Sequence, residues 1–82
     1  MSGIPLLNSF PYILSDARFL GMPIDLIIFN GLSNLSNDSD GVIDIVFMDI
    51  KTGNATLTPT QRLIKDAVEQ KRVSWMTFRV DV

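Results

Sequence analysis

The stretch that decides the fold is VFMDIKTGNATLTPTQ, residues 46–61. Its first part is an apolar run typical of a buried strand, and the TGN that follows breaks the strand. A helix then begins at Thr58, because Pro59 suits the first helical position and Thr58 with Gln61 matches the capping-box pattern. A strong strand followed closely by a capped helix indicates an α/β chain.

The same strand carries an acid and a base. Asp49 and Lys51 are two residues apart, so they project from one face of the strand. One interpretation is a same-face ion pair on an exposed strand, which would contribute little to stability. We favour a functional site, because charged residues between Met48 and Ile50 fit poorly into so apolar a run.

The remaining elements follow from the pattern on either side. Residues 24–29, IDLIIF, predict a buried strand, and residues 42–51, VIDIVFMDIK, predict the strongest strand of the chain. Residues 30–41 between them, NGLSNLSNDSDG, have the composition of a loop. Residues 73–80, VSWMTFRV, predict a final strand. With the helix as a right-handed crossover, the last two strands would be parallel in a small mixed sheet.

The length of 82 residues predicts a single domain. Pro5 and Pro11 prevent a long helix in residues 1–22, which we expect to be an extended or turn-rich arm before a core over 23–80. Hydrophobic residues make up 46% of the chain. Because so small a domain buries a modest fraction of its surface, we expect a second copy to cover part of it.

The composition restricts the chemistry that the chain can perform. It contains no cysteine and no histidine, which excludes thiol catalysis, Cys/His zinc sites and histidine-based triads. A cation with oxygen ligands, Mg²⁺ or Mn²⁺, is the compatible metal. The net charge of −2 argues against a strong nonspecific grip on nucleic acid. We find no membrane span and no signal peptide, and the lack of cysteine agrees with a cytoplasmic location.

A second acid can join the pair on the long strand. Asp25 opens the preceding strand, so pairing of the two strands would bring it beside Asp49. Two close carboxylates repel each other and raise one pKa unless a cation lies between them. Mg²⁺ would meet that need with one or two carboxylates, several waters and a phosphate. A strand-edge or turn role is the alternative for Asp25.

These residues carry a resemblance to known nucleases. PID at 23–25 and DIK at 49–51 resemble the PD-(D/E)xK motif of restriction-endonuclease-like enzymes. Over nearly the whole chain, the sequence resembles the endonuclease family related to archaeal Holliday junction resolvases. The stretches that carry this wider similarity are DARFLGMPIDLIIFNGLS at 16–33, IVFMDIKTGNATLT at 45–58 and QRLIKDAVEQKRVSW at 61–75.

The resemblance implies a minimal restriction-endonuclease-like core and Mg²⁺-dependent hydrolysis of DNA, with branched DNA as a candidate substrate. It implies that Asp25, Asp49 and the Ile50 carbonyl are metal ligands and that Lys51 is the catalytic lysine. Gln61 would be a polar active-site residue, although its capping-box role is the stronger interpretation. Together with the small core, the resemblance also suggests a homodimer.

Two further questions stay open in the sequence. Arg18, Arg62 and Lys65 are candidates for phosphate contacts, and an ordinary solvated surface is the alternative for the helical pair. The second hypothesis for the whole chain is a truncated or catalytically inactive nuclease-fold module that binds protein or serves a structural role. The short stretch before Asp25 and the acidic balance favour that hypothesis, whereas the set of Asp25, Asp49 and Lys51 opposes it.

Overall fold

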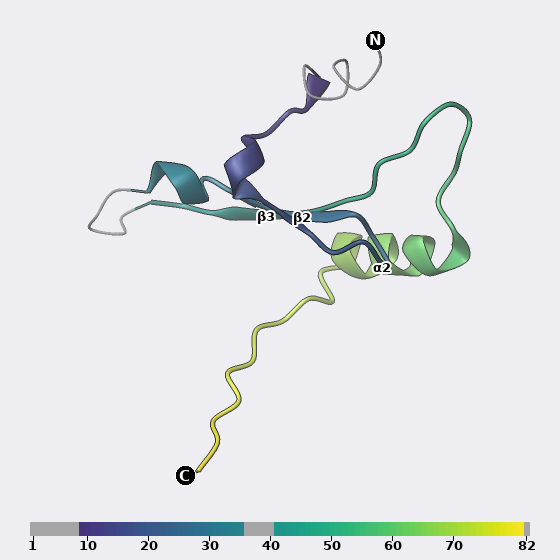
Figure 1. Cartoon of the computed structure of the whole chain (residues 1–82). Helices are drawn as coiled ribbons and strands as arrows, with labels where there is room; N and C mark the ends of the chain where they lie inside the picture. Colours follow the sequence, from purple (N-terminus) through teal and green to yellow (C-terminus); the bar gives the residue numbers. More distant parts are fainter. Residues whose placement is uncertain (1–8, 36–40, 82) are drawn as a thin grey trace. The chain divides into compact units, whose positions relative to one another are not determined.

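A three-stranded antiparallel sheet dominates the first part of the chain, and a single long helix follows it (Figure 1). The computed structural model describes residues 9–35 and 41–81. The expected α/β class is confirmed. The longer elements are β1 (Ala17–Phe19), β2 (Leu26–Asn30), β3 (Asp44–Met48) and α2 (Pro59–Glu69), and the strands lie in the order β1-β2-β3.

The chain divides into two compact units, Met1–Thr52 with the sheet and Gly53–Val82 with the helix. Among the described residues of the first unit, the buried hydrophobic side chains come from alternate positions of one segment. Ile24, Leu26 and Ile28 are 6%, 3% and 0% exposed. Because residues two apart in a strand share a face, this Ile- and Leu-rich row forms one buried surface of the sheet.

The strand register brings the predicted site residues to one edge. Leu26 pairs with Met48, and the ladder runs from there to Asn30 opposite Asp44. One step beyond the ladder, the same register places Asp25 opposite Asp49. The expected pairing of the two strands is confirmed, although both strands are shorter than the predicted 24–29 and 42–51.

A buried acid ties the loop after β2 to the start of β1. Two short 3-10 turns, η1 (Leu14–Asp16) and η2 (Leu32–Asn34), flank these strands. Asp16 is 0% exposed, and its carboxylate accepts hydrogen bonds from the amides of Gly31 at 3.2 Å and Ser33 at 2.8 Å. Gly31 has a φ of 103°, and a Cβ there would meet the Val42 carbonyl at 2.8 Å, so only glycine fits.

The arm expected over residues 1–22 contains more structure than an extended segment. The arm includes the strand β1, which pairs with β2 through Ala17 opposite Ile28. In the loop expected over 30–41, the turn η2 occupies three residues. Residues 1–8 and 36–40 lie outside the described part of the chain.

The predicted final strand over 73–80 is not assigned as a strand in the structure. The three described strands form antiparallel pairs, so the predicted parallel pair is not among them. The physical reason is that aromatic and β-branched residues favour an extended backbone, whereas a strand also needs a neighbour for its amides and carbonyls.

Helix α2 starts as the sequence predicts. The Thr58 hydroxyl accepts a hydrogen bond from the Gln61 amide, and the Gln61 side chain accepts one from the Thr58 amide, which completes the capping box. The helix ends at Glu69. Lys71, with a φ of 61°, and Arg72 follow the end in a Schellman motif, in which the Arg72 amide donates to the Ala67 carbonyl and the Lys71 amide to the Val68 carbonyl.

Candidate active site

The candidate site lies at one end of the β2–β3 pair. Asp25 immediately precedes β2, and Asp49 immediately follows β3. Because neighbouring antiparallel strands run in opposite directions, the start of one lies beside the end of the other. Both residues are partly buried, and the Asp49 side chain is 10% exposed.

The turn before β2 fixes the backbone of Asp25. The Asp25 carbonyl accepts hydrogen bonds from the amides of Leu20 at 2.8 Å and Gly21 at 3.3 Å. Gly21 has a φ of 86°, which glycine adopts at little cost. The turn that joins β1 to β2 therefore also holds the first acid of the site.

The Asp25 carboxylate reaches across to the segment after β3. Its Oδ2 accepts a hydrogen bond from the Ile50 amide at 2.7 Å. That bond is the main reason why the pKa of Asp25 is lowered. A hydrogen bond with the Asp49 side chain and the charge of Lys51 lower the pKa further, whereas desolvation by burial opposes the shift. Asp25 is therefore a carboxylate, with oxygens available as acceptors, across the neutral pH range.

Lys51 makes an ion pair with the second acid. Its Nζ contacts Oδ2 of Asp49, and the two side chains are 28% and 10% exposed. The ion pair that the sequence offered as the alternative to a functional site is thus present. However, Asp49 also shares a hydrogen bond with Asp25, so the pair belongs to a cluster of two acids and one base.

The donors of this cluster suit a hard divalent cation. The strand register brings the Asp25 and Asp49 side chains close enough to share a hydrogen bond. The described residues contain no group of three or more Asp, Glu, His or Cys side chains that could hold a metal. Mg²⁺ does not require such a cage, since it commonly binds through one or two carboxylates and keeps several waters. The residues present therefore fit Mg²⁺.

The other predicted site residues have observed structural contacts of their own. Gln61 completes the capping box, and Lys65 makes an exposed ion pair with Glu69 at 3.0 Å. Both belong to the second unit, as does Arg62, which is exposed. Their part in catalysis or phosphate binding stays a prediction, as does the role of the Ile50 carbonyl.

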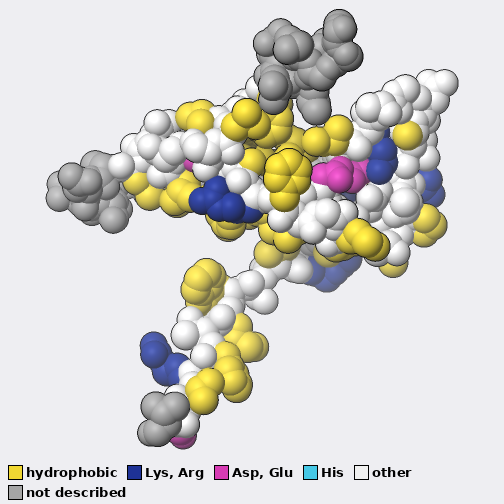
Figure 2. Space-filling view, in the orientation of Figure 1, with side chains coloured by type: hydrophobic (Ala, Val, Ile, Leu, Met, Phe, Trp, Pro, Cys, Tyr) yellow, Lys and Arg dark blue, Asp and Glu magenta, His cyan; other side chains and the backbone are white. Residues whose placement is uncertain are grey.

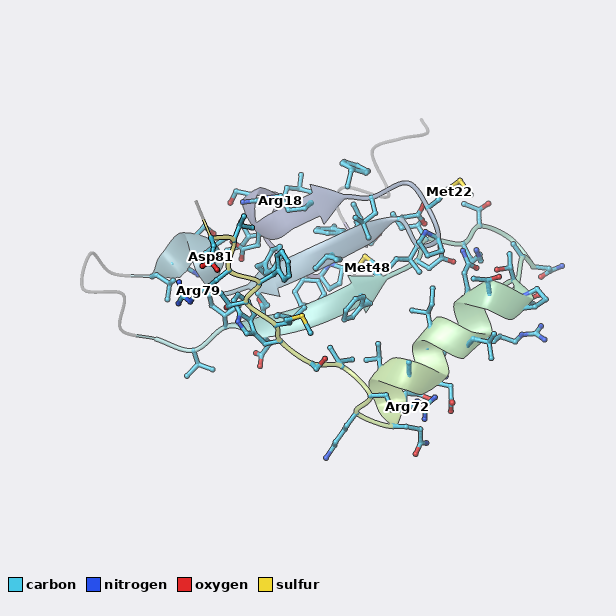
Figure 3. The ribbon with its side chains drawn as sticks, turned by 90° about the horizontal axis from the view of Figure 1, so that it is seen from below. Arg18, Met22, Met48, Arg72, Arg79 and Asp81 are labelled. Carbon is cyan, nitrogen blue, oxygen red and sulfur yellow. The ribbon has the colours of Figure 1, made fainter. Side chains whose placement is uncertain are left out.

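Arg18 lies on β1, where Figure 3 labels it. Its Nη1 donates to the carbonyls of Ser15 and Ala17, both at 2.9 Å, and the side chain remains exposed. The guanidinium is therefore held close to the edge strand. Contact with phosphate remains a prediction for this residue.

No motif in the sequence indicated a role for Asp16, whose carboxylate accepts hydrogen bonds from the Gly31 and Ser33 amides. Its pKa is lowered chiefly by the Ser33 side chain and further by the Ser33 and Gly31 amides and the charge of Arg18, while burial opposes the shift. Its partners lie 15 and 17 residues away, so no local spacing indicates the contact. We assign it a structural role, because its acceptors are directed at the loop amides.

With this geometry established, the comparison with known families is decisive. A model of the endonuclease family related to archaeal Holliday junction resolvase matches residues 2–80. The chain belongs to this family. DNA is accordingly the substrate class that membership in this endonuclease family implies.

No curated protein and no solved structure gives a significant match. Within the described residues, no helix is long and apolar enough to cross a membrane.

Proposed function

We propose that this member of the resolvase-related endonuclease family is a Mg²⁺-dependent nuclease that hydrolyses phosphodiester bonds of DNA, with branched DNA as its candidate substrate. The observation that supports this proposal best is the meeting of Asp25 and Asp49 at one sheet edge, with Lys51 paired to Asp49. The order PID…DIK then corresponds to a PD-(D/E)xK site. A homodimer, which cuts paired strands symmetrically, is part of the proposal.

Three groups would hold the metal: the carboxylates of Asp25 and Asp49 and the carbonyl of Ile50. When bound, Mg²⁺ (or Mn²⁺) would polarise the phosphoryl oxygen and lower the pKa of a water molecule. The Ile50 amide keeps the Asp25 carboxylate in place through the 2.7 Å hydrogen bond. The Asp25 carboxylate is therefore preorganised and requires little rearrangement before substrate binds.

Lys51 is the group best placed to act on the phosphate. In the structure its ammonium is paired with Asp49, and its side chain retains 28% exposure, so it can move toward an arriving phosphate oxygen. There it would offset the negative charge that develops in the transition state or orient the attacking water. No other residue of the cluster carries a positive charge.

The test compares two substitutions on the same strand segment. Asp49→Asn keeps the shape of the side chain and removes its charge, whereas Asp44→Asn makes the same change at the exposed opposite end of β3. We expect Asp49→Asn to lower Mg²⁺-dependent cleavage of branched DNA by roughly 100-fold or more, by analogy with removal of a single charge-stabilising group. Circular dichroism checks that both variants fold. Cleavage retained in Asp49→Asn would refute the assignment.

The charge distribution supports a second candidate, an inactive nuclease-fold module. The net charge is −2, and Lys51, Lys65 and Arg72 all pair with acids of the same chain. Fewer cations are then available to bind a phosphate backbone. Calorimetric titration with Mg²⁺ separates the two candidates when DNA cleavage is assayed in parallel. Absence of both binding and cleavage in the wild-type chain would favour the module.

A further inference from the structure

The turn that joins β1 to β2 presents apolar side chains beside the candidate site. Phe19, the last residue of β1, is 85% exposed, and Leu20 and Met22 in the turn are 50% and 83% exposed. Ile24, by contrast, is 6% exposed, so this stretch directs one apolar side chain into the core and keeps three outside it. Figure 3 labels Met22 at this end of the sheet. We call Phe19, Leu20 and Met22 the apolar rim.

Backbone contacts within the first unit place the apolar rim next to the candidate site. Phe19 pairs with Leu26, the residue after Asp25. The Leu20 amide donates to the Asp25 carbonyl at 2.8 Å. Asp49 lies on the far side of β2, and neighbouring strands are about 4.8 Å apart, so roughly 10 Å separate the rim from that acid. One strand of a nucleic acid can therefore contact the rim and the two acids at the same time.

The charges of the first unit make phosphate contacts a weak source of DNA affinity. Residues 1–52 contain six aspartates and two cations, Arg18 and Lys51. Lys51 is paired with Asp49, and Arg18 donates to two carbonyls of its own segment. Figure 2 shows Lys and Arg side chains scattered over the visible face, with apolar side chains between them. The electrostatic part of DNA affinity grows with the number of phosphates that Lys and Arg neutralise, so a strand bound at this site must draw on another interaction.

The apolar rim has the side chains that supply such an interaction. Phe, Leu and Met are among the residues that DNA-binding proteins insert between base steps. Stacking of a base on an aromatic ring adds affinity without any charge, and it accepts every base because each has a flat face. Bases inside a continuous duplex already stack on their neighbours, whereas bases at a branch have a face available. The rim therefore fits a base at a branch better than it fits a regular duplex.

We propose that the apolar rim stacks on unpaired bases where a DNA duplex branches, and that this contact places a phosphodiester close to the branch at Asp25 and Asp49. The inference rests on the proposed nuclease function and names the feature of the substrate that the site recognises. A stacked strand rises about 3.4 Å per nucleotide, so the separation of roughly 10 Å corresponds to about three nucleotides. Cleavage is accordingly expected within about three nucleotides of the branch.

The test is a cycle of two proteins and two DNAs, with affinity measured by fluorescence anisotropy. The DNAs are forked duplexes whose first unpaired nucleotides are either normal or abasic. Ca²⁺ replaces Mg²⁺, because it also takes oxygen ligands and the readout then does not depend on cleavage. We expect Phe19→Ser to raise the Kd for the normal fork about tenfold and to leave the Kd for the abasic fork nearly unchanged. Equal affinities of the wild-type chain for the two forks would overturn the proposal, since stacking requires a base.

Matched variants separate stacking from a structural role. Phe19→Tyr keeps an aromatic ring and should bind both forks like the wild type. Leu14→Ser is the control, because Leu14 is 57% exposed on η1, at the other end of β1. A Phe19→Ser variant that unfolds at lower urea concentration, yet binds both forks like the wild type, would show that the rim packs within the chain and would overturn the proposal. Failure of the nuclease assignment would appear elsewhere, as cleavage retained in Asp49→Asn, and would not alter this comparison of affinities.

Discussion

Replacing Lys51 by methionine should separate metal binding from catalysis. The ammonium of Lys51 occupies Oδ2 of Asp49, one of the atoms proposed to bind Mg²⁺. A cation at this position competes with Lys51 for the carboxylate and is repelled by its charge. Lys51→Met keeps most of the aliphatic stem and removes both effects. We therefore expect tighter Mg²⁺ binding and loss of cleavage in the same variant.

The size of the first effect follows from Coulomb's law. A unit charge about 5 Å from a dication opposes it by roughly 1.7 kcal/mol at the dielectric constant of water. Lys51 is only 28% exposed, so water-like screening gives the lower limit. A change of that size corresponds to at least about tenfold tighter Mg²⁺ binding.

Isothermal titration calorimetry with Mg²⁺ measures this affinity, and cleavage of branched DNA is followed in parallel. Lys65→Met is the control, because Lys65 pairs with Glu69 on the helix surface and should leave both quantities unchanged. Weaker Mg²⁺ binding in Lys51→Met would show that the lysine supports the metal site and does not compete with it. Full cleavage would show that it is not the catalytic lysine.

Three further predictions concern stability. Ile28→Ala, at a fully buried position, should lower the free energy of unfolding by roughly 2–5 kcal/mol in urea titrations, with little loss for the half-buried Ile27→Ala. Thr58→Ala removes the helix cap and should cost about 1 kcal/mol by the same measurement, whereas Thr58→Ser should not. Folding lowers the pKa of the Asp16 carboxyl below 3.8, its value in the unfolded chain. The ionised carboxylate therefore stabilises the fold above pH 3.8, and this stabilisation is lost as the pH falls through the pKa of the folded state. Asp16→Asn should therefore destabilise the chain at neutral pH, and its difference from wild type should shrink below pH 3.8, while a constant difference would contradict this.

The site geometry was more accessible from the sequence than most of the fold. Alternation alone put Asp49 and Lys51 on one face, and the pairing of two Ile-rich strands was enough to bring Asp25 opposite Asp49. What the sequence could not provide was the Ile50 amide bound to Asp25, which sets the pKa of that acid. A backbone donor has no sequence signature, because every residue except proline carries one.

Long-range polar contacts account for the other omission. Asp16 is the one acid before Asp25 in the sequence, and its amide partners lie beyond β2. Gly31 indicated that a turn lies there, and the structure adds that its amide faces a buried carboxylate. Burial of an acid depends on the donors that surround it, which only the folded chain reveals.

The final segment shows where a residue pattern stops being informative about a strand. VSWMTFRV at 73–80 specifies an extended backbone and an apolar character, and both are observed. It does not specify which edge supplies the hydrogen bonds, because a ladder is a property of two segments. An extended apolar segment can pair with any strand edge that reaches it, so its partner depends on tertiary structure, which the residue pattern of a single segment does not contain.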